Sequence, residues 1–317
     1  MKPMRCRRLL AASAVLAVLV ACSGGSGSKA GGLAVQVASY DLATGAPTRF
    51  IVGLITNDQR LIGYGTVDLR FSYVGTKEGV NQQPFGPAVT ASYLPIFGSV
   101  IPSPPPAAAQ IVRSSDTRGV YGAQTSFDKA GFWEVEVTAT IDGKAQRGKG
   151  AFAVNPTHAV PGPGDAALAT ESLTLTTPDT PKAAIDSRGG SGDIPDPDLH
   201  RTTIASSLAA KRPVVVVFST PVYCTSRFCG PITDLVEELA HQYPNRADFV
   251  HVEVWRDFQT MTVNKSAADW VYRNDELQEP WVFVIGADGK VAARFDNVVT
   301  RGELEPIIKA LPVIAPR

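Results

Sequence analysis

Sulfur and nitrogen ligands are scarce in this chain. Among 317 residues there are four cysteines, three methionines and four histidines, and the histidines are scattered at His158, His200, His241 and His251. A carrier of a soft metal needs several such ligands close together. The sequence therefore predicts no metal site and no cofactor.

Excess charge is also lacking, since 30 basic residues stand against 30 acidic ones. A chain without a basic surplus has no electrostatic footprint for a nucleic acid. We therefore expect no nucleic-acid partner.

Long apolar runs are absent except between residues 9 and 20. Four basic residues precede this run, which is too short to span a bilayer, and the stretch ends in Leu-Val-Ala-Cys at Cys22. The ending resembles the lipobox of bacterial lipoproteins, which implies cleavage before Cys22 and acylation of its sulfur with palmitate-type chains. We expect residues 1–21 to be a signal peptide, residues 22–32 a flexible Gly/Ser tether, and the protein to be lipid-anchored on the extracytoplasmic face of the cell membrane.

Few thiols would remain after this processing. Cleavage removes Cys6 and lipidation consumes Cys22, which leaves Cys224 and Cys229. Disulfides form and persist outside the cytoplasm. We therefore expect these two cysteines to form a disulfide bond with each other at some stage.

The N-terminal part, residues 33–155, has the pattern of strands. Apolar and polar residues alternate over 64–74 and again over 131–141, which predicts antiparallel strands with one solvated face. We expect an all-β immunoglobulin-like sandwich of about seven strands. The proline-rich stretch 81–109 is predicted to be a long surface loop, which would bind a partner, brace the second domain or be a disordered insertion.

Residues 156–198 carry seven prolines, which is typical of an extended linker. From residue 199 the pattern alternates between helix and strand. We expect helices over 200–212, 229–243, 264–274 and 300–311, and strands over 213–218, 247–255 and 280–295. This order predicts an α/β domain over residues 199–317.

Three features of that domain, in this order, resemble the thioredoxin-like superfamily. An apolar strand over 214–218 ends shortly before Cys224, a helix follows with a cysteine at its entry, and Pro280 begins a later strand. Thioredoxins carry a cis-proline beside the active-site cysteine at that place. The resemblance implies an α/β thioredoxin-like fold and a thiol–disulfide oxidoreductase site made of Cys224, Cys229 and Pro280.

The spacing of the cysteines departs from the thioredoxin pattern, because four residues separate them instead of two. Residues five apart in a helix have Cα atoms about 8.6 Å apart, whereas a disulfide needs roughly 4.4–6.8 Å. Either Cys224 lies in the loop before the helix or the first turn unwinds. Pro231 suits a first helical turn, which favours a helix that begins near Cys229. The distance from the strand favours Cys224 as the attacking thiol and Cys229 as the resolving one.

Three further residues are candidates for a supporting role. Arg227 and the helix N-terminus would lower a thiol pKa, unless Arg227 is only a solvated loop residue. Glu279 would raise a thiol pKa or carry a proton, unless it faces solvent. Trp281 is first a packing residue, placed near the site by its neighbour Pro280.

Other functions remain open. Cys224-Thr225 and Cys229-Gly230 resemble the cysteine motif of Q-type peroxiredoxins, although Val217 and Pro221 stand where that family has Pro and Thr. A non-enzymatic lipoprotein with a structural disulfide is a second alternative. Copper delivery is a weaker one, because such proteins use a shorter spacing and an added histidine. For the oxidoreductase we expect a protein disulfide or thiol as substrate and a membrane or extracytoplasmic electron partner.

Overall fold

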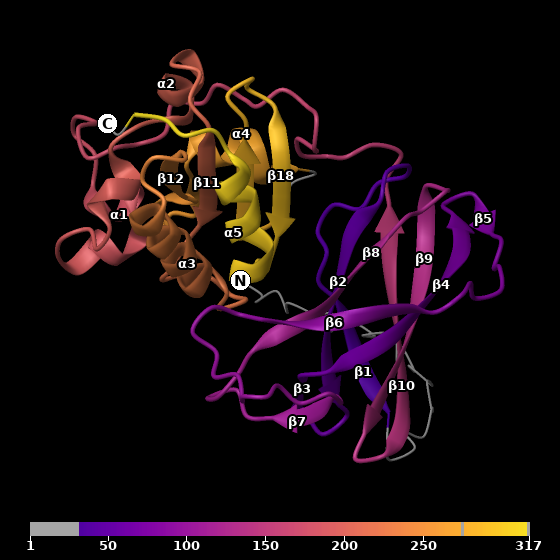
Figure 1. Cartoon of the computed structure of the whole chain (residues 1–317). Coiled ribbons are helices and arrows are strands. Elements are labelled where there is room, and N and C mark those ends of the chain that lie inside the picture. Colours follow the sequence, from indigo (N-terminus) through magenta and orange to yellow (C-terminus); the bar gives the residue numbers. More distant parts are fainter. Residues whose placement is uncertain (1–31, 274–275, 316–317) are drawn as a thin grey trace, which may run out of the picture.

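The computed structural model describes residues 32–273 and 276–315. Figure 1 shows two regions side by side, an N-terminal sheet and a C-terminal region in which helices flank a smaller sheet. The expected signal peptide and the lipidation site Cys22 lie outside the described residues. Among those that are described, no helix is both long enough and apolar enough to cross a membrane.

The N-terminal region is one antiparallel sheet of ten strands with the order β10-β9-β4-β6-β8-β2-β3-β7, where β1 pairs with β2 and β5 with β4. The turn Asp142-Gly143 between β9 and β10 has positive φ at both residues, as a tight hairpin requires. The strands are β1 Leu33–Val37, β2 Thr48–Thr56, β3 Leu61–Gly63, β4 Thr66–Thr76, β5 Gly79–Val80, β6 Val89–Pro95, β7 Gln110–Val112, β8 Gly119–Thr125, β9 Gly131–Ile141 and β10 Lys144–Val154.

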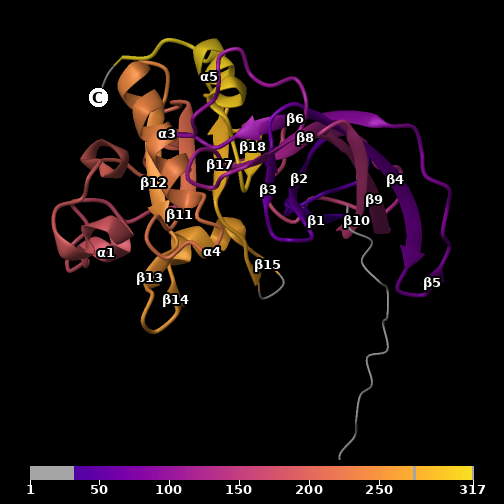
Figure 2. The same ribbon diagram turned by 90° about the horizontal axis from the view of Figure 1, so that it is seen from below.

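This sheet curls around its own core. Strand β1 is bonded to β2, yet it also lies along β10, with a bridge from Gly32 to Arg147, and Figure 2 shows the resulting curvature. The alternation seen in the sequence buries one side of β9, where Val135, Val137 and Ala139 are at most 1% exposed. Edge-to-face aromatic pairs such as Phe50 with Phe71 fill the interior.

The C-terminal region is built on a four-stranded sheet with the order β12-β11-β17-β18. Strands β11 (Val214–Ser219) and β12 (Asp248–Glu253) are parallel, and the pairs with β17 (Trp281–Ile285) and β18 (Val291–Asp296) are antiparallel. Helices α3 (Cys229–Gln242) and α5 (Arg301–Ala310) cover one face of this sheet. Helices α2 (Ile204–Ala209) and α4 (Lys265–Val271) cover the other face.

Short elements complete this region. Two hairpins follow β12, namely β13 Trp255–Asp257 with β14 Thr262–Val263 and β15 Tyr272–Arg273 with β16 Glu276–Leu277. The predicted linker 156–198 includes helix α1 (Lys182–Ile185) and the 3-10 turn η1 (Ser187–Ser191), and a second 3-10 turn, η2 (Pro197–His200), ends it. Helix α1 and η2 pack on β12, so this part of the segment lies against the C-terminal sheet. The domain boundaries themselves remain predictions.

The fold class expected from the sequence is wrong. The structure is 38% strand and 17% helix with a large antiparallel sheet, which does not fit an α/β thioredoxin-like domain. Two predicted helices are short, because only Ile204–Ala209 and Lys265–Val271 of the expected stretches are α-helical. The immunoglobulin-like sandwich is replaced by a single sheet of ten strands. Alternation identifies the wet face of each strand, but it does not say how many sheets the strands form.

The proline-rich stretch 81–109 also differs from its prediction as a surface loop. Its middle, Val89–Pro95, is strand β6, which pairs with β4 on one side and with β8 on the other. The prolines stand before this strand, at its last position or after it, so no ladder hydrogen bond inside it is lost. Directly after β6, Ile96 and Phe97 pack against the C-terminal region. The stretch therefore braces that region.

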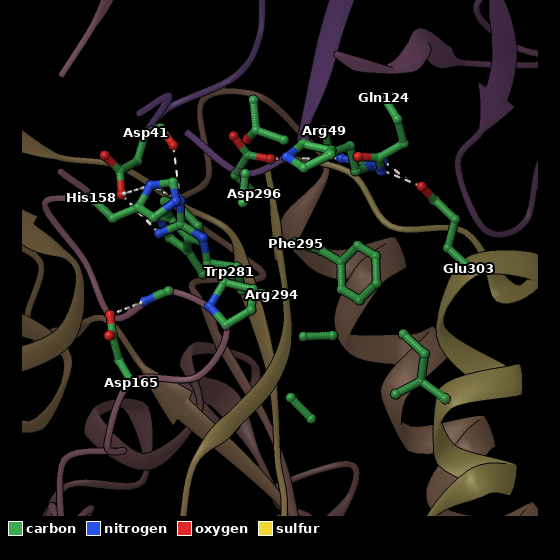
Figure 3. Close-up of a pocket in the computed structure, with 18 of the residues that line it drawn as sticks. Asp41, Arg49, Gln124, His158, Asp165, Trp281, Arg294, Phe295, Asp296 and Glu303 are labelled. Atoms are coloured by element: carbon green, nitrogen blue, oxygen red, sulfur yellow. Dashed lines mark hydrogen bonds and ion pairs between the residues drawn. The ribbon is translucent and has the colours of Figure 1, made fainter. Parts of the chain in front are cut away.

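Charged side chains join the two regions along the edge strand β18. Arg49 donates to Glu303 at 2.7 Å, Arg294 donates to Asp41 at 2.8 Å, and the backbone N–H of Tyr40 donates to Asp296 at 2.6 Å. A cleft of about 580 Å³ is lined by Asp41, Arg49, Arg294, Asp296 and Glu303, and Figure 3 shows these side chains directed at one another. Because each of these carboxylates already has an arginine partner, the cleft is better explained as a contact between the two regions than as a binding site.

Candidate redox site around Cys224 and Cys229

The end of β11 places both cysteines. Every residue of β11 is buried, and the chain then leaves the sheet in a loop that carries Cys224 before α3 begins at Cys229. The backbone N–H of Cys224 donates to the carbonyl oxygen of Thr220 at 3.1 Å. The two cysteines are disulfide-bonded, with Cα atoms 6.0 Å apart. One cysteine thus lies in the loop and the other at the mouth of the helix, which is the first of the two arrangements that the spacing allowed.

The two sulfurs have different surroundings. Cys229 is fully buried, whereas Cys224 is partly exposed. The backbone N–H of Cys229 donates to the sulfur of Cys224 at 3.4 Å, and the Ser226 hydroxyl lies 3.2 Å from that sulfur. Donors directed at a sulfur stabilise its thiolate. The accessible sulfur is therefore the one equipped to carry negative charge.

Glu279 lies beside the disulfide, and a carboxylate oxygen of it is within 4.8 Å of both sulfurs. Its Oε2 atom is buried and has no hydrogen-bond partner in the described part of the chain. Burial, with a smaller contribution from the charge of Glu253, raises the pKa of Glu279 to about 8. The carboxyl group is thus protonated at neutral pH. It can give a proton to a sulfur or take one from it.

The backbone around Glu279 is held from the N-terminal region. The Glu279–Pro280 peptide bond is cis, and the hydroxyl of Tyr40 donates to the Glu279 carbonyl oxygen at 2.7 Å. Tyr40 belongs to the segment after β1, so the N-terminal sheet contributes directly to the site. The sequence held no signal for this contact, because 239 residues separate the two partners.

The other two predicted residues, Arg227 and Trp281, are described by their own contacts rather than by a contact with the sulfurs. Arg227 is exposed, has a positive φ of 61°, and lines a small cavity against the N-terminal sheet together with Leu61 and Val112. Trp281 is only 2% exposed and stacks with Phe283 in the core on the α2 and α4 side of the sheet. The expectation that Trp281 is first a packing residue agrees with this position.

A mostly apolar cleft of about 470 Å³ adjoins the loop that carries Cys224. Tyr223 and Phe258 stack face to face at 4.0 Å between ring centres on one side of it. Sequence reasoning missed this cleft, since its residues come from four separate segments. The lining residues are Tyr40, Tyr223, Thr225, Ser226, Trp255, Phe258, Met261, Leu277, Gln278 and Glu279.

Behind the disulfide, hydroxyl groups form a buried chain of hydrogen bonds. The Thr233 hydroxyl donates to the Cys229 carbonyl oxygen at 2.9 Å and lies 2.7 Å from the Ser219 hydroxyl. The Ser219 hydroxyl in turn lies 3.0 Å from Nε2 of His251. Cys229 is thereby connected to a second cluster of polar side chains, which the sequence did not predict.

The arrangement combines a partly exposed sulfur, a buried partner sulfur and a carboxyl group that holds a proton near neutral pH. An accessible sulfur and a second sulfur that can resolve the mixed disulfide are what exchange between thiols and disulfides needs, and a carboxyl group beside them can move the proton. A scan against protein-family models and a search of curated proteins find no match for the chain. What the site does must therefore be argued from its own residues.

Proposed function

We propose that the chain is a membrane-anchored, extracytoplasmic thiol–disulfide oxidoreductase that works through Cys224 and Cys229. One observation carries the proposal. The accessible sulfur of Cys224 receives the Cys229 N–H and faces the Ser226 hydroxyl, and the buried carboxyl group of Glu279 lies within 4.8 Å of both sulfurs. A disulfide that only staples the chain has no need of such surroundings.

In the reducing direction, the thiolate of Cys224 attacks one sulfur of a substrate disulfide. The substrate S–S bond breaks, a mixed disulfide forms at Cys224, and the departing thiolate takes a proton. The thiol of Cys229 then loses its proton and attacks the Cys224 sulfur. This step expels the second substrate sulfur as a thiolate, which takes a proton from solvent, and leaves the Cys224–Cys229 disulfide. The oxidising direction runs through the same steps in reverse.

Glu279 supplies and collects the proton in these two steps. Its protonated carboxyl group donates to the first departing thiolate, and its carboxylate then accepts the proton of Cys229. A pKa of about 8 suits both roles at neutral pH, because a proton carrier works best when its pKa lies near the working pH.

The apolar cleft beside Cys224 supports a polypeptide substrate. Its aromatic residues, among them Tyr223, Trp255 and Phe258, offer contact area to apolar side chains that flank a substrate cysteine. Substrates are therefore protein disulfides or thiols presented outside the cytoplasm. A membrane or extracytoplasmic electron partner would return the Cys224–Cys229 pair to its working state.

A redox titration of the full-length protein tests the proposal. A structural disulfide has a reduction potential below about −300 mV, whereas a catalytic pair lies well above it. We expect the higher value, together with reduction of insulin disulfides in the presence of a thiol reductant. A potential below about −300 mV with no insulin reduction would show that the disulfide is structural.

Trapping the mixed disulfide tests the roles of the two cysteines. Cys229→Ser keeps the attacking sulfur but cannot resolve the intermediate, so it should accumulate covalent adducts with reduction-sensitive linkage. Cys224→Ser is the matched control and should form none. Adducts on Cys224→Ser instead would reverse the assignment. Consumption of hydrogen peroxide by the reduced protein, lost in Cys224→Ser, would favour a peroxidase.

A further inference from the structure

A second polar cluster lies at the edge strand β12, connected to Cys229 through the hydroxyl groups of Ser219 and Thr233. It consists of Asp186, which ends α1, His200, which ends η2, and His251 in the middle of β12. These side chains are between 0% and 1% exposed. They come from segments up to 65 residues apart and have no role in the proposed redox chemistry.

The distances in the cluster are too long for good hydrogen bonds. Asp186 Oδ2 lies 3.3 Å from His251 Nδ1 and 3.6 Å from His200 Nε2. Within the described residues, neither ring nitrogen of His200 nor Nδ1 of His251 makes a hydrogen bond. Buried polar atoms are nearly always bonded. Two of these nitrogens, His200 Nε2 and His251 Nδ1, face the same carboxylate oxygen, so they call for a further partner.

The same distances are those of ligands around one metal ion. A tetrahedral zinc ion binds nitrogen and oxygen ligands at about 2.0–2.2 Å, which places neighbouring ligand atoms about 3.3–3.6 Å apart. Both Asp186–His distances match this edge length, and the three ligand atoms lie within 4.8 Å of one another. Asp196 Oδ1, 3.4 Å from His200 Nε2 and without a hydrogen bond, is the nearest further oxygen.

The hydrogen-bond chain behind the disulfide fixes the tautomer of His251. Its far end is the carbonyl oxygen of Cys229, which can only accept, so the Thr233 hydroxyl donates to it. The Ser219 hydroxyl must then donate to Thr233, and Nε2–H of His251 donates to Ser219. In a neutral imidazole this leaves the lone pair of Nδ1 facing a carboxylate oxygen 3.3 Å away. Two acceptors so placed need either a further proton or a metal ion between them.

We propose that Asp186, His200 and His251 bind a structural Zn²⁺ ion, with Asp196 as the nearest candidate for a fourth ligand. Histidine and carboxylate ligands suit zinc, and an enclosed site is structural rather than catalytic. The hydrogen bond from His251 to Ser219 is the outer contact that orients a metal-ligating imidazole. Arg188 holds both carboxylates, at 2.7 Å to Asp186 and 2.8 Å to Asp196.

The charges of the cluster also accommodate the ion. Asp186, Asp196 and Asp234 all pair with Arg188. Three negative charges against one positive charge leave a net charge of −2, which a Zn²⁺ ion would neutralise. The bound ion would tie residues 186–200 to the edge strand β12. Because the site is sealed, zinc would enter as this segment folds onto the sheet.

Zinc loading of the oxidised full-length protein tests the site, since the disulfide then offers no thiolate to compete for the metal. We expect about one zinc per chain, measured by mass spectrometry of the metal after dialysis, and a midpoint of thermal unfolding that rises with zinc concentration. Cobalt loaded in place of zinc should give the visible absorption of a tetrahedral nitrogen and oxygen site. These measurements on the unaltered chain do not depend on any variant that folds.

Matched variants locate the metal. His200→Gln should lose the bound zinc and the cobalt absorption, whereas His241→Gln, at an exposed position of α3, should keep both. The proposal is overturned if the oxidised protein retains no zinc after loading and its unfolding midpoint does not respond. It is equally overturned if His200→Gln retains as much zinc as His241→Gln. In both cases the cluster is held by protons rather than by a metal.

Discussion

The cysteine cluster after β11 and the histidine cluster at β12 have similar numbers of potential ligands but differ in their access to solvent. Each gathers three potential ligand atoms within 4.8 Å, namely Cys224, Cys229 and Glu279 in one and Asp186, His200 and His251 in the other. The first is built on a loop with one sulfur partly exposed, and the second is sealed between a strand and the segment that covers it. On the two proposals, access to solvent separates a site that reacts with a substrate from one that binds a metal for stability.

The largest effect on exchange activity should come from a variant of the cysteine cluster. Cys224→Ser removes the attacking sulfur, so we expect thiol–disulfide exchange to fall by more than about 100-fold. Insulin reduction measures this loss. Val222→Ser, at a residue of the same loop that is 54% exposed, is the control and should keep most of the activity. Activity that survives in Cys224→Ser would remove the functional difference between the two clusters.

A variant of the histidine cluster should instead lower the free energy of unfolding. Asp186→Asn leaves Arg188 and the two imidazoles without their central charge, and loss of one partner from a buried ionic group costs about 3–5 kcal/mol. Urea unfolding of the oxidised protein measures the free energy. Asp193→Asn is the matched control, since within residues 32–273 and 276–315 Asp193 pairs only with Lys182 and its side chain is 99% exposed. A change below about 1 kcal/mol in Asp186→Asn would contradict the account.

Glu279 should set the pH dependence of thiol–disulfide exchange at the cysteine cluster. As pH rises through about 8 the carboxyl group ionises, and the new charge repels an attacking thiolate and can no longer donate a proton. After correction for thiolate concentration, the rate at which a small thiol reduces the disulfide should therefore fall across this pH. In Glu279→Gln the corrected rate should show no such bend and should be about tenfold lower at neutral pH. An unchanged bend in that variant would show that another group titrates.

The same carboxyl group should give the oxidised protein a pH-dependent stability. Its pKa is raised on folding, from an ordinary value of 4.5 to about 8, so between these values the folded state binds more protons than the unfolded state. The free energy of unfolding should then decrease as pH rises through this window. Glu279→Gln should flatten the decrease, as measured by urea unfolding at several pH values. Equal slopes in the two proteins would contradict the assignment.

The sequence predicted the local parts of the redox site better than the fold around it. Spacing and helix geometry were enough to place Cys224 in a loop and Cys229 at a helix entry, because both constraints act within a few residues. The fold class was wrong, because period-two patterns do not encode how strands associate. Tyr40 and the histidine cluster were missed for a related reason, since their contacts join segments far apart in the chain.

The smallest effect should come from cutting the connection between the clusters. Ser219→Ala removes the hydroxyl that lies between Thr233 and His251, and the loss of one buried hydrogen-bond partner costs about 1–3 kcal/mol. His251 Nε2 also lies 3.3 Å from the Ser219 carbonyl oxygen, which remains and can take over the bond. We therefore expect the free energy of unfolding, measured in urea, to fall by about 1 kcal/mol. The rate of insulin reduction should change by less than about threefold. Thr233→Val cuts the same chain one step nearer to Cys229 and should behave alike. If either variant loses exchange activity as fully as Cys224→Ser while it stays folded, the two clusters form one functional unit, and burial alone does not separate them.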